Sequence, residues 1–268
     1  MAVIDSGVDT AHPELAGAIA GSFDALNSKE GAHQHGTAIA GAIAARVTLT
    51  GTAPSARILA IRAFDNSGSG PEGTTITLLR SLNWVIARGA RIINMSFAGP
   101  YDPQIAKALS AARQRGVILV AAAGNSGPNS PVFYPAADPN VIAVAATDSE
   151  DKLFPQSSRG RHMAIAAPGS DIIVPVNGGG YQALSGTSFA AAHVSGVVAL
   201  LLQLKPRLSP DAVTKILQST AKDLGPKGRD DQFGAGLADA YRAILSLPPE
   251  VAGARPSASA PTQLMSGN

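Results

Sequence analysis

Three short motifs carry the side chain types that acyl transfer requires. Asp5 ends an apolar run, His35 opens the motif HGT, and Ser188 lies in the motif GTSFA. A serine hydroxyl is a poor nucleophile until a base removes its proton, and a buried carboxylate holds that base in the right tautomer. We therefore expect Ser188 as the nucleophile, His35 as the base and Asp5 as the orienting carboxylate.

A fourth motif supplies a hydrogen-bond donor for the negative charge that acyl transfer creates. Asn125 follows the apolar run Val117–Ala122 and stands between glycines in AAAGNSG. Its amide can donate to the oxyanion beside the backbone N–H of Ser188. Ser188 itself opens a predicted helix, whose unpaired N–H groups and positive dipole end favour the same charge. We expect Asn125 to act as the oxyanion donor.

Apolar runs and helical patterns alternate along the chain. The runs predict buried strands, and the patterns between them predict helices that end at glycine. Repeated strand–helix–strand order predicts an α/β fold, a doubly wound and mostly parallel sheet with helices on both faces. Ligands of such sheets bind beyond the carboxyl ends of the strands. The predicted strands are Ala2–Ile4, Ile58–Phe64, Ile92–Met95, Val117–Ala122 and Val141–Ala146, and the helices between them are His35–Ala45, Thr74–Arg88 and Pro103–Arg115.

The last third of the chain adds helices and a polar tail. Thr187–Leu204 is apolar nearly all round, which predicts a buried helix. Ser209 and Pro210 open another helix, and Leu237–Leu245 predicts the last. We expect one domain over residues 1–246. Residues 247–268 are rich in Pro, Ala and Ser, with little to bury, and are predicted to form a disordered tail or linker.

Composition excludes several classes of function. The chain has 268 residues, a formal net charge of +2 and no cysteine. It therefore has no disulfide, thiolate metal site or cysteine nucleophile. The small net charge gives no field for nucleic acid or an anionic membrane, and no apolar run reaches the roughly 18 residues of a membrane span. We expect a monomer that acts on polypeptides, without nucleic acid or membrane partners.

The four motifs, in the order Asp5, His35, Asn125 and Ser188 along the chain, resemble those of the subtilisin-like serine proteases, the subtilases. The resemblance extends from about Ala2 to Leu245 and includes the connecting segments TAP, NMS and APG. It implies a serine endopeptidase in which Asp5, His35 and Ser188 form the triad and Asn125 donates to the oxyanion. An α/β-hydrolase esterase is excluded because no GxSxG elbow surrounds Ser188. A peptide ligase with the same residues, and a binding module on an inactive scaffold, remain alternatives.

The resemblance also implies how substrate binds. The family holds peptide as an extended strand between two protein segments, a form of β-augmentation. Because Ala98 and Phe133 stand where relatives often have smaller residues, we expect a shallow pocket that prefers small or medium apolar side chains before the cut. The predicted substrate-binding residues are Ser67, Gly68, Ser69, Gly70, Ser96, Phe97, Ala98, Gly99, Ala122, Gly124 and Phe133.

Two departures from the family pattern, and the position of His33, lead to further expectations. The connection Arg46–Gly51 is short where subtilisins carry a calcium-binding loop, so we expect that site to be absent and no cofactor to be needed. His33 is expected to face solvent. The first catalytic strand begins at Ala2, so the domain is N-terminally shorter than its relatives. We expect upstream sequence with a signal peptide or an inhibitory pro-segment, and a secreted or periplasmic protein.

Overall fold

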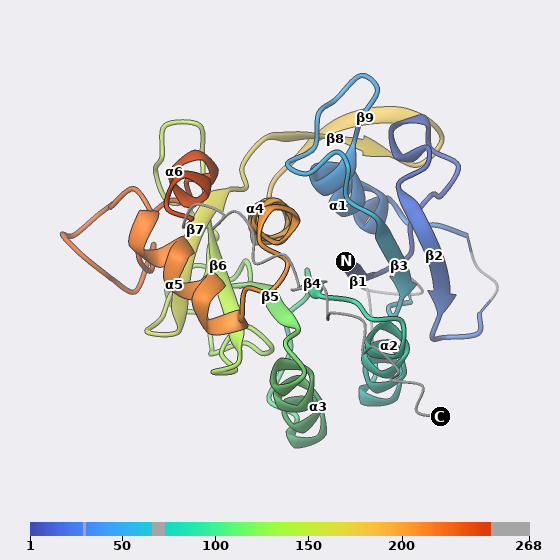
Figure 1. Ribbon diagram of the computed structural model, residues 1–268, viewed down its shortest axis with the longest axis horizontal. Helices are drawn as coiled ribbons and strands as arrows, with labels where there is room; N and C mark the ends of the chain where they lie inside the picture. Colours follow the sequence, from blue (N-terminus) through green and yellow to red (C-terminus); the bar gives the residue numbers. More distant parts are fainter. Residues whose placement is uncertain (29–30, 66–72, 248–268) are drawn as a thin grey trace, which may run out of the picture.

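A parallel sheet of seven strands forms the middle layer of the molecule (Figure 1). The computed structural model describes residues 1–28, 31–65 and 73–247. The strands are β1 (Ala2–Asp5), β2 (Ile19–Asp24), β3 (Ile58–Arg62), β4 (Ile92–Met95), β5 (Ile118–Ala122), β6 (Val141–Thr147) and β7 (Met163–Pro168). Their order across the sheet is β2-β3-β1-β4-β5-β6-β7. A separate antiparallel hairpin pairs β8 (Ile172–Val176) with β9 (Gly180–Leu184).

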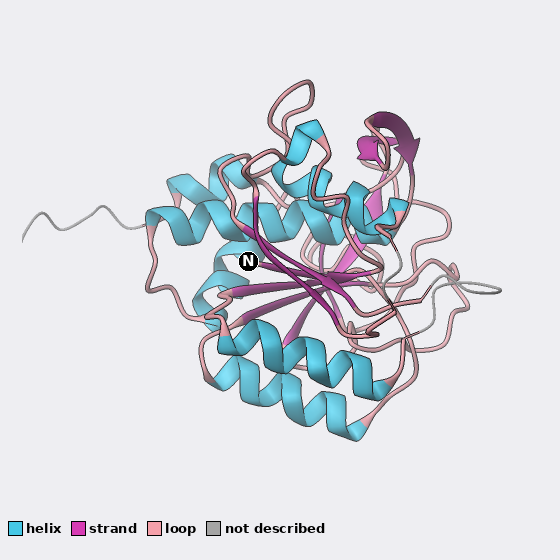
Figure 2. Cartoon of the chain, turned by 90° about the vertical axis from the view of Figure 1, so that its right-hand side faces the viewer, coloured by secondary structure: helices cyan, strands magenta, loops and turns pink. Residues whose placement is uncertain are grey.

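Helices cover both faces of this sheet (Figure 2). One face carries α2 (Thr75–Ala87) and α3 (Pro103–Gln114), which pack against each other. The other face carries α1 (Gln34–Ala44), α4 (Thr187–Leu204), α5 (Pro210–Thr220) and α6 (Ala240–Leu245), and a short 3-10 helix, η1 (Pro13–Leu15), lies beside α1. The fold is the doubly wound α/β architecture that the sequence predicts.

Both faces of the sheet are buried, which explains the continuous apolar runs of its strands. Ile93 and Leu119 belong to the core beneath α2 and α3, while Ile92 and Val120 belong to the core beneath α4. Neighbouring residues of a strand point to opposite faces, so a strand covered on both sides is apolar at every position.

The predicted strands and the helices before α6 agree with the structure to within two residues at each end. Thr74 caps α2 with a reciprocal hydrogen-bond pair to Thr77, and Gly89 follows this helix with φ of +70°. The predicted last helix begins three residues later than expected, at Ala240. The strands β2 and β7 and the β8–β9 hairpin were missed. β2 is an edge strand of mixed burial, so its pairing with β3 defines it more than its own apolar pattern.

The helix α4 runs through the centre of the molecule. Its length and composition would allow it to cross a membrane, but 67% of it is buried inside the fold. It packs against β4, β5, β6 and α1. It is therefore a core helix, and its first turn emerges at the edge of the sheet where the strands end.

Candidate active site

The strand order brings three of the motifs to one edge of the sheet. β1, β4 and β5 are neighbours and run parallel, so their carboxyl ends lie side by side. Asp5 ends β1, Ser96 follows β4, and Asn125 follows β5 after two residues. The N-terminal turns of α1 and α4, which pack against each other, carry His35 and Ser188.

Asp5 and His35 are hydrogen-bonded. The imidazole Nδ1 lies 2.8 Å from the Asp5 Oδ1 atom, which also accepts the backbone N–H of Ser6 at 2.7 Å. Asp5 is 3% exposed, whereas the His35 side chain is 34% exposed. Burial lowers the pKa of His35, but the charge and hydrogen bond of Asp5 outweigh it, so that the pKa is raised above its usual 6.5.

The start of α1 is built around His35. His33 is the N-cap, because its Nδ1 accepts the backbone N–H of His35 at 3.3 Å. Gly36 lets the helix approach the loop after β1, since a Cβ there would lie 2.1 Å from the Gly7 carbonyl oxygen. The expectation that His33 faces solvent was wrong, because the ring is partly buried and contacts the Ser6 hydroxyl at 3.0 Å.

Ser188 lies in the first turn of α4 and is 7% exposed. Its hydroxyl donates to the backbone carbonyl of Ser96 at 3.3 Å, and the Ser96 hydroxyl donates to the backbone carbonyl of Ser188 at 3.1 Å. The ring of Phe189, the next residue, lies 6.2 Å from the His35 ring between centroids. Two reciprocal bonds thus hold Ser188 at the end of β4. In this structure the Ser188 hydroxyl donates to Ser96, so it must turn toward the imidazole before His35 can take its proton.

Sequence reasoning missed a polar network that supports this serine. Asn94 is fully buried in β4, donates to the Ser96 hydroxyl at 2.9 Å and accepts the Ser195 hydroxyl at 2.9 Å. Ser195 lies two turns along α4 from Ser188. The network therefore links α4 to β4. Its signal in the sequence is the single Asn within the otherwise apolar strand IINM.

The Asn125 amide is oriented by its neighbour across the site. Its oxygen accepts the backbone N–H of Thr187 at 2.9 Å and the Thr187 hydroxyl at 3.0 Å. Asn125 is exposed, and its Nδ2 lies close to Gly186, where an added Cβ would be only 3.2 Å away. A donor held in this way suits the role of stabilising an oxyanion.

Of the two predicted substrate-binding segments, only the second lies within the described residues. Ser67–Gly70 lie outside the described residues. In the segment Ser96–Gly99, the backbone of Gly99 is engaged with Tyr134 through bonds of 2.8 and 2.9 Å. Ala98 is exposed, and its backbone has no hydrogen-bond partner among the described residues. The backbone of Ala98 is therefore open to pair with a peptide.

The other predicted pocket residues meet beyond the end of β5. The Phe133 ring packs against Gly124, where a Cβ would lie 2.7 Å from it, so these two residues do border the same space. Ala122 is 3% exposed and belongs to the apolar core beneath α4, so it does not form part of an exposed binding surface.

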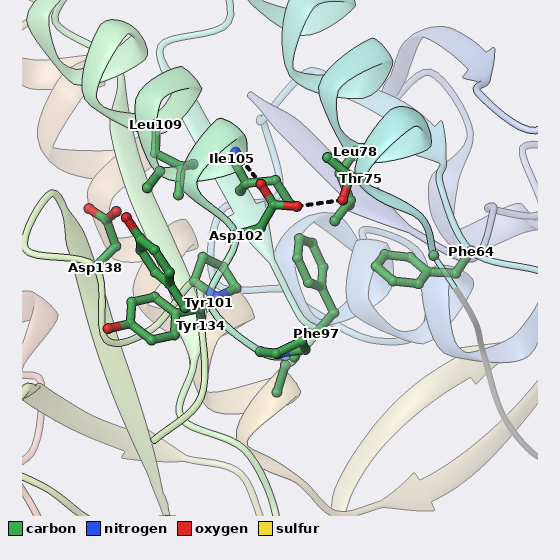
Figure 3. A pocket seen from close by; sticks show the side chains of 16 residues that line it. Phe64, Thr75, Leu78, Phe97, Tyr101, Asp102, Ile105, Leu109, Tyr134 and Asp138 are labelled. Atoms are coloured by element: carbon green, nitrogen blue, oxygen red, sulfur yellow. Dashed lines mark hydrogen bonds between the residues drawn. The ribbon is translucent and has the colours of Figure 1, made fainter. Parts of the chain in front are cut away.

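A cavity of about 400 Å³, not predicted from the sequence, lies between the first turns of α2 and α3 (Figure 3). Its walls are mostly apolar and aromatic, and Phe97, Ala98 and Gly99 form part of them. Asp102 at its rim accepts the Thr75 hydroxyl at 2.5 Å and the backbone N–H of Ile105 at 3.1 Å. The cavity is thus continuous with the segment that Ala98 leaves open.

The short connection after α1 is organised around a carboxylate. Glu14 is fully buried and accepts four backbone N–H groups, from Arg46 (3.1 Å), Val47 (2.8 Å), Thr48 (2.7 Å) and Leu49 (3.0 Å), and the Tyr181 hydroxyl at 2.8 Å. Burial raises the pKa of Glu14, but these hydrogen bonds lower it to about 2. Residues 1–28, 31–65 and 73–247 contain no group of three or more His, Cys, Asp or Glu placed to hold a metal ion.

Known proteins share this sequence pattern and fold. The profile of the subtilase family matches residues 1–236. Thermitase of Thermoactinomyces vulgaris is 37% identical over 253 residues, which cover 91% of this chain and 88% of thermitase. The minor extracellular protease Epr of Bacillus subtilis is 38% identical over 244 residues, but the match spans only 37% of its length.

Solved structures of proteases agree with this assignment. Fervidolysin from Fervidobacterium pennivorans, a keratinolytic enzyme related to subtilisin, superposes with a TM-score of 0.83 and 33% identity, over 93% of this chain and 42% of its own. The prenylagaramide maturation protease PagA gives a TM-score of 0.79 with 34% identity, over 91% of this chain and 92% of its own. These relatives indicate a hydrolase, and the chain belongs to the subtilase family of subtilisin-like serine proteases.

Proposed function

We propose that the chain is a serine endopeptidase that cuts peptide bonds through an acyl-enzyme. The observation that carries the proposal is the 2.8 Å bond between Asp5 and His35, at the sheet edge where α4 presents Ser188. A buried carboxylate bonded to Nδ1 fixes the tautomer in which Nε2 is free to accept a proton. Asn125 and the backbone N–H of Ser188 supply the donors beside it.

The reaction proceeds in two acyl transfers. His35 Nε2 takes the proton from the Ser188 hydroxyl as its oxygen attacks the substrate carbonyl carbon, and Asn125 donates to the resulting oxyanion. The tetrahedral intermediate expels the amine, which receives the proton from His35, and the acyl-enzyme remains. Water then attacks the ester with His35 again as the base, and the carboxylic acid product leaves as Ser188 regains its proton.

The substrate is proposed to lie as an extended strand along Ala98, whose backbone is unpaired among the described residues. A peptide in this position passes the 400 Å³ cavity between α2 and α3, which offers room for one apolar side chain. Phe133 narrows the space beside Gly124, so small or medium apolar residues are favoured directly before the cut.

A fluorophosphonate probe tests the assignment of the nucleophile. We expect one equivalent of probe to label the native chain at Ser188, and Ser188→Ala to abolish both labelling and peptide cleavage. Ser185→Ala is the matched control, because Ser185 is exposed and pairs with Asp171, away from the imidazole. Labelling that survives Ser188→Ala would contradict the assignment.

A peptide library tests the preference before the cut. We expect cleavage after residues of the size of Ala, Val or Leu to exceed cleavage after Phe, Tyr or Lys.

The relatives include a protease whose name describes it as extracellular, and we propose that this protein is exported too. Fractionation of the native organism, with the protein found only inside the cytoplasm, would contradict that proposal.

A further inference from the structure

The Ser6 hydroxyl lies between two hydrogen-bond acceptors next to the proposed triad. Its oxygen is 3.0 Å from Asp5 Oδ1 and 3.0 Å from His33 Nδ1. Ser6 is 2% exposed, so bulk water does not compete for these bonds. A serine hydroxyl has a single proton and therefore donates to only one acceptor at a time.

The role of His33 as N-cap decides which acceptor receives this proton. The backbone N–H of His35 donates to His33 Nδ1, so that the neutral ring keeps a lone pair on Nδ1 and its proton on Nε2. Two lone pairs 3.0 Å apart repel each other, so the Ser6 O–H donates to Nδ1 as well, and the one Nδ1 lone pair is shared with the longer 3.3 Å bond from the His35 N–H. Neutral His33 therefore draws the Ser6 proton away from Asp5.

The position of this proton matters to the base. Asp5 Oδ1 already accepts the backbone N–H of Ser6 at 2.7 Å and faces His35 Nδ1 at 2.8 Å. A further donor on the same oxygen would stabilise the carboxylate by itself and weaken its stabilisation of the imidazolium. With the hydroxyl turned toward His33, more of the Asp5 charge acts on His35.

We propose that His33 is a positioning residue of the active site, whose neutral ring holds the Ser6 hydroxyl proton and so leaves Asp5 free to act on His35. This inference rests on the triad proposed above. When His33 is protonated, its Nδ1–H donates to Ser6 Oγ, the Ser6 hydroxyl keeps its proton and donates a hydrogen bond to Asp5 Oδ1, and the side-chain cap of α1 is lost. His33 thereby couples the cap of α1 to the basicity of His35.

The charged surroundings keep His33 in the neutral form. Burial lowers the pKa of His33, His35 on α1 lowers it further, Asp5 on β1 raises it, and Arg62 on β3 lowers it, with a net shift below 6.5. These are the charged groups of the described residues that act on the ring. The pKa of His35 is shifted the other way. His33 therefore loses its proton at a lower pH than His35 does.

The test measures the pKa of His35 by NMR titration of the imidazole in a Ser188→Ala background, where autolysis is prevented. His33→Phe keeps an aromatic ring but removes the acceptor, so Ser6 turns to Asp5, and we expect the pKa of His35 to fall by about half a unit or more. Ser6→Ala alone should leave it near its original value. The double variant should also return to that value, because no hydroxyl is left to redirect.

His33→Asn is the matched control, since Asn keeps a side-chain acceptor and is a good N-cap. We expect it to retain the original pKa of His35. A melting temperature for each variant separates loss of the cap from loss of the acceptor, and His33→Ala replaces His33→Phe if the latter does not fold. The inference is overturned if removal of the acceptor leaves the pKa unchanged, or if the double variant stays as low as His33→Phe.

Failure of this inference and failure of the proposed function give different results. If Ser188→Ala abolishes labelling but the pKa of His35 is the same in all His33 variants, the proposed activity stands and this inference is wrong. Labelling that survives Ser188→Ala overturns the proposed activity whatever the titrations show.

Discussion

The Asn125 side-chain oxygen accepts two hydrogen bonds from Thr187, one from its backbone N–H at 2.9 Å and one from its hydroxyl at 3.0 Å. The Thr187 hydroxyl in turn accepts the backbone N–H of Gly124 at 3.1 Å. Thr187 precedes the proposed nucleophile, so the same residue aims the amide and leads into the turn that presents Ser188. The oxyanion donor and the nucleophile are thus positioned together.

This relationship predicts graded losses of turnover. We expect Asn125→Ala to lower kcat by about 10²–10³ with little change in KM, a magnitude carried over from measurements on a subtilisin's own oxyanion amide. Thr187→Val keeps the shape but removes one of the two bonds that aim the amide, so a smaller loss of roughly tenfold is expected. Steady-state kinetics on one peptide substrate measure both. A rise in KM with kcat unchanged would show instead that Asn125 acts in substrate binding.

The Asp5–His35 bond predicts the pH dependence of activity. His35 must be neutral to accept the Ser188 proton, and Asp5 raises its pKa above 6.5. The acid limb of kcat/KM should therefore lie above pH 6.5, with activity rising as the pH increases through it. Asp5→Asn should lower kcat by roughly 10⁴ and move the remaining acid limb to lower pH. An acid limb below 6.5 in the unchanged protein would contradict this assignment.

Glu14 predicts an acid-sensitive contribution to stability. Its pKa is about 2 in the folded protein against 4.5 in an unconstrained glutamate. Because the folded pKa is the lower one, the contribution is complete above about pH 4.5 and is lost as the pH falls toward 2. Glu14→Gln places an NH₂ group against backbone N–H donors and should cost about 3 kcal/mol. Urea unfolding at several pH values measures both effects.

A matched control separates the carboxylate from its neighbours. Tyr181→Phe removes only the hydroxyl that donates to Glu14 and should cost about 1 kcal/mol. A Glu14→Gln variant as stable as the native chain at pH 7 would show that the loop at residues 46–49 is held by other contacts.

The same loop predicts that a chelator does not change the stability of the protein. It turns four backbone N–H groups inward, and such groups bind an anion and repel a cation. We expect excess EDTA to leave the melting temperature of the native chain unchanged, with thermitase measured alongside for comparison. A fall of several degrees that added calcium reverses would reveal a cation site elsewhere.

The sequence by itself determined the sheet class, most element boundaries and the identity of the proposed catalytic groups. Buried parallel strands must be apolar at every position, so runs such as Ile118–Ala122 are visible without any partner. The proposed catalytic groups can be found in the sequence because each lies in a short motif at or near the end of a predicted strand or helix: Asp5, His35, Asn125 and Ser188. The edge strand β2 escaped because its burial depends on β3 and not on its own pattern.

Only the tertiary structure decided the contacts between segments distant in sequence. Nothing near Ser6 or His33 indicates that they share a proton across 27 residues, nor that Thr187 aims an amide 62 positions away. The connection Arg46–Gly51 was interpreted from its length alone, and only the structure shows that a carboxylate from η1, Glu14, meets four backbone N–H groups after α1. Such pairings depend on strand order and helix packing, which bring side chains together in space and leave no periodic trace along the chain.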